Sequence, residues 1–131
     1  METRIITTAV IKHKKKYLIA KRAASKKFAP NKWEFISGFV DTPETAEKII
    51  LRELKEELSV KGKIAKMAEP YSITDKEARW ITLPYLIEVS NSGFTINKKD
   101  HSEVKWVELK DLAKYNDLKK DIQEMKKRGM F

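Results

Sequence analysis

Alternating apolar and polar positions recur along the chain and predict a fold rich in strands. Strands are predicted over residues 3–11, 16–22, 33–36, 62–74, 79–90 and 103–108. The HKKK sequence between the first two predicts a hairpin turn, and Asn91-Ser92-Gly93 predicts another. The polar residues 23–32, which include Pro30 and Asn31, predict a loop. Pro70 and Pro84 each imply a sheet edge or a bulge, because proline cannot donate a ladder hydrogen bond.

Two helices are predicted, one after Thr42 and one from about residue 109. Thr42 can cap the first helix, and Pro43 suits its first position. Glu44 and Glu47 would then lie near the positive end of the helix dipole. The second helix has an apolar stripe made of Leu112, Leu118, Ile122 and Met125. Two separated helices among strands predict a single α/β domain over residues 1–131, a sandwich with a mixed sheet.

The first helix carries a stripe of acids beside its apolar stripe. At about 100° per residue, Glu53, Glu56 and Glu57 fall within an arc of roughly 100°. The neighbouring arc is apolar and consists of Ile50, Leu51, Leu54 and Leu58, and the opposite side carries Lys48, Arg52 and Lys55. Three close carboxylates repel one another, and a hard divalent cation such as Mg²⁺ would relieve that repulsion. The alternative is a solvated helix whose acids form salt bridges.

Composition excludes several other kinds of site. The chain has no cysteine, which excludes disulfides and thiolate metal sites and fits the cytoplasm, and its two histidines form no zinc pattern. No apolar run approaches a membrane span, and the N-terminus shows no signal pattern. The net charge of +9 either keeps the protein soluble or steers an anionic ligand to it. Nucleic acid is not the expected partner, because no RNP-like aromatic motif or arginine-rich tract is present.

Residues 38–60 carry a more specific pattern. Gly38 is followed by Glu44 and then by Arg52-Glu53-Leu54-Lys55-Glu56-Glu57 and Val60. The segment resembles the Nudix box, Gly-x5-Glu-x7-Arg-Glu-U-x-Glu-Glu-x-Gly-U with U a bulky apolar residue, except that Ser59 replaces the last glycine. The preceding RAASKKFAPNKWEF resembles the same region of MutT-like nucleoside triphosphate pyrophosphohydrolases, although Ile36-Ser37 replaces a common Pro-Gly pair.

This resemblance implies a Nudix-type α/β/α sandwich and a Mg²⁺-dependent hydrolase, with Mn²⁺ as another possible ion. A nucleoside triphosphate, cleaved to monophosphate and pyrophosphate, is the first substrate it suggests. The alternatives are another nucleoside diphosphate derivative, such as ADP-ribose or a dinucleoside polyphosphate, and a non-catalytic nucleotide sensor or RNA-binding module. Some family members that act on ADP-ribose carry a marker proline after the box, and some that act on dinucleoside polyphosphates carry a marker tyrosine. Neither residue is present in residues 75–78. A monomer or a homodimer is expected.

The resemblance also implies roles for individual residues. It places Glu53, Glu56 and Glu57 on the metal, with the backbone of Gly38 as a further ligand. Arg52 is expected to hold the loop and helix by ion pairing with Glu44, although a simple pair with Glu56 would also explain it.

A further acid often precedes the last strand in this family. Asp100 and Glu103 are the candidates for a general base or a second metal ligand. Glu103 is slightly preferred, because a strand can hold it firmly.

Substrate contacts are expected from the residues before the box and from aromatic side chains. Glu34 belongs to the segment that lines the nucleotide pocket in the family, and Arg22 could reach phosphates. Five aromatic residues are candidates for stacking on a base, of which two are expected to touch ligand: Trp33, Phe35, Trp80, Tyr85 and Trp106.

Overall fold

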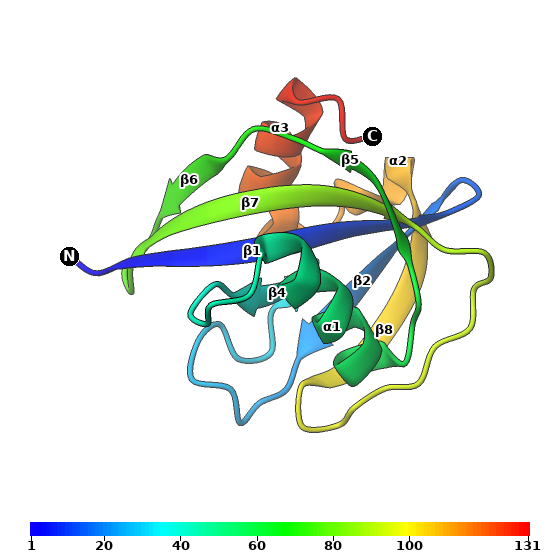
Figure 1. Cartoon of the computed structure of the whole chain (residues 1–131), viewed down its shortest axis with the longest axis horizontal. Coiled ribbons are helices and arrows are strands. Elements are labelled where there is room, and N and C mark those ends of the chain that lie inside the picture. Colours follow the sequence, from blue (N-terminus) through cyan, green and yellow to red (C-terminus); the bar gives the residue numbers. More distant parts are fainter.

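A single mixed sheet forms the centre of the molecule (Figure 1), and the computed structural model describes all 131 residues. Its eight strands are β1 (Thr3–His13), β2 (Lys16–Arg22), β3 (Trp33–Glu34), β4 (Ile36–Phe39), β5 (Lys63–Met67), β6 (Tyr71–Thr74), β7 (Arg79–Glu88) and β8 (His101–Glu108). The strand order is β3-β2-β1-β7-β5, with β8 beside β2, β4 beside β1 and β6 beside β7. Only β1 and β7 pair in parallel. The predicted mixed sheet is therefore confirmed.

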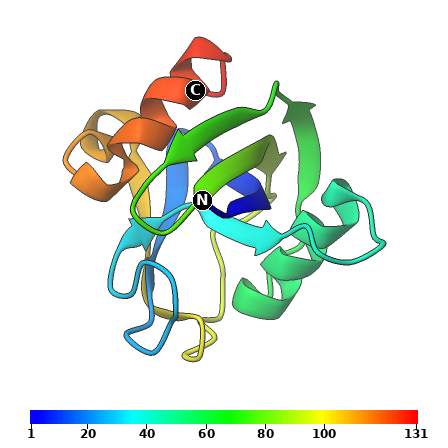
Figure 2. The ribbon, with the colours of Figure 1, turned by 90° about the vertical axis from the view of Figure 1, so that its left-hand side faces the viewer.

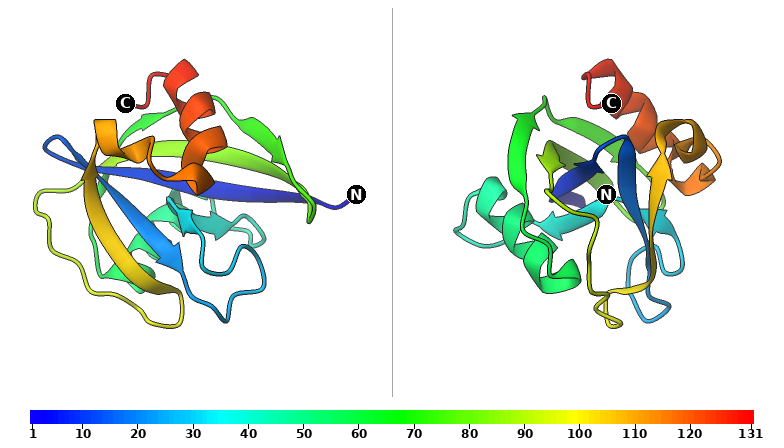
Figure 3. Two further views of the ribbon diagram at one scale, coloured as in Figure 1. Left: turned by 180° about the vertical axis from the view of Figure 1, so that it is seen from behind. Right: turned by 90° about the vertical axis from the view of Figure 1, so that its right-hand side faces the viewer.

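Helices cover both faces of this sheet. They are α1 (Ala46–Leu58), α2 (Leu109–Leu112), the 3₁₀ helix η1 (Asn116–Leu118) and α3 (Lys119–Lys127). Figure 2 shows α1 and α3 on opposite sides of the strands, and the left view of Figure 3, seen from behind, shows α2 and α3 together in front of them. One apolar cluster includes Leu54 and Leu58 of α1, and the other includes Ile122 and Met125 of α3. The expected α/β/α sandwich is thus observed.

The first helix begins three residues later than the sequence suggests. The side chain of Thr45, not Thr42, caps α1 by accepting a hydrogen bond from the backbone N–H of Lys48 at 3.3 Å. Thr42 instead donates to the carboxylate of Glu44 at 3.0 Å. Glu44 therefore stays in the loop before the helix, where Arg52 can reach it. The predicted cap at Thr42 was wrong: Glu44 pairs with Arg52, eight positions further along the chain, and the helix begins only after Thr45.

Pro84 was expected at an edge or a bulge, but it lies within the interior strand β7. The strand predicted over residues 62–74 is interrupted at residues 68–70, and this gap faces Pro84. Ala68 N–H donates to the carbonyl oxygen of Pro84, so that side of Pro84 points towards the gap. An extended residue directs its N–H and C=O to the same side. The missing proline N–H therefore falls where the neighbouring ladder is already broken.

The C-terminal region is helical as predicted, although it consists of three short helices rather than one. Every member of the predicted apolar stripe is buried: Leu112, Leu118, Ile122 and Met125. The breaks between the helices bring the N-terminal end of α3 to the edge of the cavity described below.

Candidate active site

Helix α1 lies against β4, and Gly38 allows the close approach. A Cβ atom at Gly38 would lie 2.7 Å from Cγ of Glu53 and 3.1 Å from Cγ2 of Ile49, closer than side-chain carbons tolerate. A residue without a side chain is required there for steric reasons. The carboxyl group of Glu53 is consequently held beside the backbone of β4, at the junction of helix and sheet.

Arg52 ties the loop before α1 to the helix. Its guanidinium donates to both carboxylate oxygens of Glu44, at 2.7 and 3.3 Å, and it also lies 3.4 Å from Glu56 and 3.6 Å from Glu53. Hydrogen bonding to Arg52 is the main reason that the pKa of Glu44 lies below its usual range. Both interpretations of Arg52 from the sequence therefore apply together: it pairs with Glu44 and with Glu56.

Glu57 is the buried member of the acid stripe, and Glu53 beside it is half-buried. Burial raises the pKa of Glu53, and it raises the pKa of Glu57 to about 10, with the charges of Glu53 and Glu34 adding to the effect. One carboxylate oxygen of Glu57, Oε2, is buried and has no hydrogen-bond partner. The charged form of this pair is therefore unfavourable without a cation nearby.

A hard divalent cation fits this arrangement. Carboxylate oxygens are the ligands that Mg²⁺ and Mn²⁺ prefer, and an unpaired buried carboxylate oxygen is the group that such an ion would satisfy. Glu56 is half-exposed and turned towards Arg52, so the three box glutamates do not converge on one point in this structure. Glu53 and Glu57 could hold such an ion, and Glu56 could join them by exchanging Arg52 for the metal.

The structure separates the two further acids. Asp100 precedes β8, forms an ion pair with Lys26 at 2.7 Å, and its charge adds to the raised pKa of both Glu53 and Glu57. Glu103 is half-exposed and lies 3.7 Å from Lys105, whose ammonium group sits over the ring of Trp33. The geometry therefore brings Asp100, and not Glu103, to the buried glutamates.

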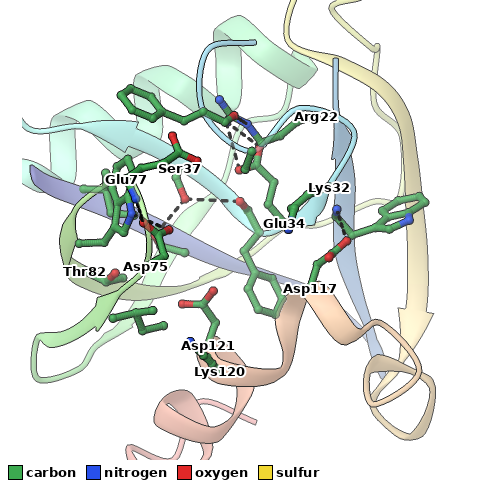
Figure 4. A pocket seen from close by; sticks show the side chains of 18 of the residues that line it. Arg22, Lys32, Glu34, Ser37, Asp75, Glu77, Thr82, Asp117, Lys120 and Asp121 are labelled. Atoms are coloured by element: carbon green, nitrogen blue, oxygen red, sulfur yellow. Dashed lines mark hydrogen bonds and ion pairs between the residues drawn. The ribbon is translucent and has the colours of Figure 1, made fainter. Parts of the chain in front are cut away.

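A cavity of about 520 Å³ (Figure 4) reaches Gly38, but Glu53, Glu56 and Glu57 are not among the residues that line it. Gly38 lines this cavity together with the residues before the box and the aromatic residue of β7 that were expected to bind substrate. These residues are Arg22, Trp33, Glu34, Phe35 and Trp80. Arg22 donates to both carboxylate oxygens of Glu34, at 3.2 and 3.3 Å, and to the carbonyl oxygen of Phe28 at 2.8 Å. This guanidinium is therefore held in one place on the cavity wall.

The five candidate aromatic residues divide into two groups. Trp33, Phe35 and Trp80 line the cavity, and Trp80 forms a cluster there with Phe28 and Phe39. The other two, Tyr85 and Trp106, do not line it. Tyr85 is buried and donates to Glu47 of α1 at 2.8 Å, and Trp106 donates to the carbonyl oxygen of Ser92 at 2.8 Å.

Several cavity residues are not apparent from the sequence pattern. Lys119, Lys120 and Asp121 come from the N-terminal end of α3, and Lys32 comes from the loop before β3. Tyr71 donates to Asp121 at 2.7 Å, and burial raises the pKa of Asp121. Only the run of charges at the start of the last helix could have indicated this group, because nothing local shows that α3 reaches the cavity.

Comparison with known proteins identifies the family. The family model of the NUDIX domain matches residues 2–128, so the chain belongs to the Nudix family. The nucleoside triphosphatase NudI of Klebsiella pneumoniae strain 342 is 30% identical over 129 residues, covering 88% of this chain and 89% of that protein.

Two solved structures show the same fold. A MutT protein from Methanosarcina mazei Go1 is 20% identical with a TM-score of 0.80, covering 88% of this chain and 84% of that one. The NUDIX domain of Shewanella oneidensis NrtR, solved with ADP ribose, is 21% identical with a TM-score of 0.71, covering 96% of this chain and 87% of that one.

The resemblance to MutT-like Nudix hydrolases is therefore confirmed. The protein is an enzyme that hydrolyses phosphoric anhydride bonds. Every helix is too short or too polar to cross a lipid bilayer.

Proposed function

We propose that the protein hydrolyses a nucleoside triphosphate to the monophosphate and pyrophosphate, with Mg²⁺ as the activating ion. The observation that carries this proposal is a cavity that runs from Gly38, beside the half-buried Glu53, to the aromatic and polar residues near α3. Its volume of about 520 Å³ suits a nucleotide-sized ligand. The name of the NudI relative supports a triphosphate substrate.

Two groups of residues would take different roles, one in the acid stripe next to Gly38 and one along the cavity wall. Glu53, Glu56 and Glu57, with the backbone of Gly38, would hold the ion, which when bound polarises phosphoryl oxygens and lowers the pKa of water. Arg22 and Lys32 line the cavity wall, where they would bind phosphate oxygens. Trp33, Phe35 and Trp80 supply the apolar surface against which the base and sugar would pack.

Asp100 is the residue that we propose as general base. Its carboxylate already lies close enough to the box glutamates to influence their charge, and its partner Lys26 is on a flexible stem. Release of that ion pair would free Asp100 to accept the proton of an attacking water, with the proton leaving the water oxygen as that oxygen attacks phosphorus. This assignment replaces the preference for Glu103, which faces Lys105 instead.

A panel of substrates tests the proposal. Nucleoside and deoxynucleoside triphosphates, ADP-ribose and dinucleoside polyphosphates would each be incubated with Mg²⁺ or Mn²⁺ and the products resolved by anion exchange. Monophosphate plus pyrophosphate from a triphosphate is expected. Turnover of ADP-ribose alone would favour the alternative supported by the NrtR structure, which holds that ligand.

Metal dependence and the acid stripe are tested with the confirmed substrate. Excess EDTA should abolish turnover, and full activity in EDTA would contradict the metal assignment. Glu53→Gln, Glu56→Gln and Glu57→Gln should each lower kcat by about 100-fold or more while leaving the fold intact. Glu108→Gln is the control, because Glu108 is exposed and pairs only with Lys110. Near-normal rates in all three box variants would mean that the stripe is structural.

A further inference from the structure

His101 is completely buried at the start of β8, between the acid stripe and the cavity. Its Nε2 lies 2.8 Å from Oε2 of Glu34. A ring nitrogen at that distance from a carboxylate oxygen must carry a hydrogen, so Nε2–H is the donor. The other ring nitrogen, Nδ1, has no hydrogen-bond partner and lies 3.8 Å from Oε1 of Glu57. The imidazole therefore stands between a cavity residue and a buried box glutamate.

The contact with Glu34 extends a chain of hydrogen bonds into the cavity. Glu34 receives hydrogen bonds from His101 on one side and from Arg22 on the other, and Arg22 Nε–H donates to the carbonyl oxygen of Phe28. Glu34 and Arg22 line the cavity, whereas His101 does not. The guanidinium of Arg22 is thus fixed by Glu34, and Glu34 is fixed by a residue that has no access to ligand.

A purely structural histidine would be expected to satisfy both ring nitrogens inside the protein, because a buried polar atom without a partner is costly. His101 leaves Nδ1 unsatisfied while keeping the Nε2 contact with Glu34. An apolar side chain of similar size would avoid that cost and fill the same space. The position of His101 is therefore better explained by the hydrogen bond that it donates than by packing.

We propose that His101 is a positioning residue: its Nε2–H holds the carboxylate of Glu34, and Glu34 in turn holds the guanidinium of Arg22 where it meets the phosphates of the ligand. This role rests on the proposed function for the identity of the ligand, but the hydrogen-bond chain itself exists without ligand. This positioning role requires an N–H donor at the location of Nε2 and does not require a charge on the imidazole. A side chain that places an N–H at that point should therefore replace it.

Two substitutions separate the donor from the bulk of the side chain. The amide nitrogen of glutamine can reach the position of Nε2, so His101→Gln should keep the hydrogen bond, whereas His101→Leu removes it and keeps most of the volume. His13→Gln is the matched control, because His13 is the other histidine of the chain and its ring contacts only Val89 and Trp106 in the structure.

The first measurement uses no substrate. In ¹⁵N-labelled protein, the Nε–H resonance of Arg22 should be protected from exchange, because it donates to Phe28 at 2.8 Å. It should shift or broaden in His101→Leu and return to the wild-type position in His101→Gln and His13→Gln. An unchanged Arg22 resonance in folded His101→Leu would overturn the proposal. If His101→Leu does not fold, His101→Asn replaces it, because its amide reaches the position of Nδ1 and not that of Nε2.

The second measurement separates binding from chemistry. In His101→Leu we expect KM for the triphosphate to rise about tenfold, with kcat changed less than about threefold. A rise of this size corresponds to the loss of one hydrogen bond between a charged side chain and the phosphates. His101→Gln should restore KM. Glu34→Gln should show the same rise, and adding His101→Leu to it should have no further effect. Independent, multiplying effects would show that His101 does not act through Glu34.

Failure of the proposed function would look different. If the wild-type protein cleaves no triphosphate, the reaction assigned above is wrong, but the Arg22 resonance still decides whether His101 holds the pair. If the wild type is active and both His101 variants have normal KM and a normal Arg22 resonance, the positioning role is wrong and the enzyme assignment stands.

Discussion

At the scale of single residues, Asp100 and Glu103 differ most in how close they lie to the box glutamates. Asp100 lies near Glu53 and Glu57, and Glu103 faces Lys105 on the other side of β8. We expect Asp100→Asn to lower kcat at saturating Mg²⁺ by at least about tenfold, and Glu103→Gln to change it less than about twofold. The reverse ranking would return the assignment to Glu103. Equal, small effects would leave water activation to the ion and the box glutamates.

The sequence could identify the candidates but could not rank them. A strand residue such as Glu103 is held firmly, yet its direction depends on which face of the sheet it occupies, and the bulge between Lys21 and Arg22 alters the register beside it. The role of His101 cannot be predicted from the sequence for a similar reason. Its partner Glu34 is 67 positions away along the chain, so no local pattern reveals the contact. By contrast, Gly38, Arg52 and the box glutamates follow a fixed spacing within one continuous segment, so the sequence alone identifies them.

Asp121 provides a test that depends on pH. Burial raises its pKa in the folded chain. A carboxyl group whose pKa is higher in the folded protein than in the unfolded one binds its proton more tightly in the folded state. The stability that this adds is complete below the unfolded pKa, near 4, and is lost as the pH rises through the folded pKa. Asp121→Asn should therefore raise Tm relative to the wild type, and the gain should grow as the pH rises above the unfolded pKa, near 4. Asparagine can still accept the hydrogen bond of Tyr71.

The control for this experiment is Asp111→Asn. Asp111 is exposed, and its hydrogen bond with Lys114 lowers its pKa, so this substitution should produce no gain and a slight loss at neutral pH. Thermal unfolding of the two variants across the same pH series distinguishes burial of a charge from a general effect of charge removal. A gain for Asp121→Asn that does not depend on pH would contradict the role given to its ionisation.

At the scale of elements, the end of α1 departs from the family pattern. Ser59 stands where the Nudix box has glycine, and it adopts a left-handed conformation with φ 55° and ψ 35°. A residue with a Cβ is strained there by roughly 1 kcal/mol. Ser59→Gly should therefore stabilise the protein by about 1 kcal/mol, measured by urea unfolding, and leave kcat unchanged. Ser102→Gly in the strand β8 should instead destabilise it, because glycine is unfavourable in a strand.

Most elements could be predicted because their patterns are local, and the failures share one cause. The strands and the apolar stripe of the C-terminal helices follow simple periodicity. The start of α1 depended on the pair between Glu44 and Arg52, and the tolerance of Pro84 depended on a gap in the neighbouring strand. In both cases a contact outside the local pattern decided between two locally acceptable structures: one joins residues eight positions apart, and the other joins residues on either side of a gap between strands. Such contacts become visible only when the segments are placed in space.

At the scale of the whole molecule, the charge distribution makes a prediction about substrate capture. The chain carries a net charge of +9, and its cavity is lined by Arg22 and three lysines together with five acids, of which Asp75, Glu77 and Asp117 are exposed. A positive field draws in a polyanionic substrate, and salt screens that attraction over about 8 to 10 Å. We therefore expect kcat/KM for a triphosphate to fall as ionic strength rises from about 20 mM to about 500 mM, with little change in kcat.

Two double variants show whether the net charge or its location matters. Lys119→Glu with Lys120→Glu changes the rim of the cavity, and Lys15→Glu with Lys16→Glu changes the exposed hairpin between β1 and β2. Each pair lowers the net charge from +9 by 4, to +5. If the field at the cavity steers the substrate, the first pair should reduce kcat/KM several-fold more than the second at low salt, and the difference should disappear at high salt. Equal losses in the two variants would mean that the excess of lysine acts only through total charge. No loss in either variant would favour the other interpretation of the basic composition, in which the lysines keep the protein in solution and take no part in binding.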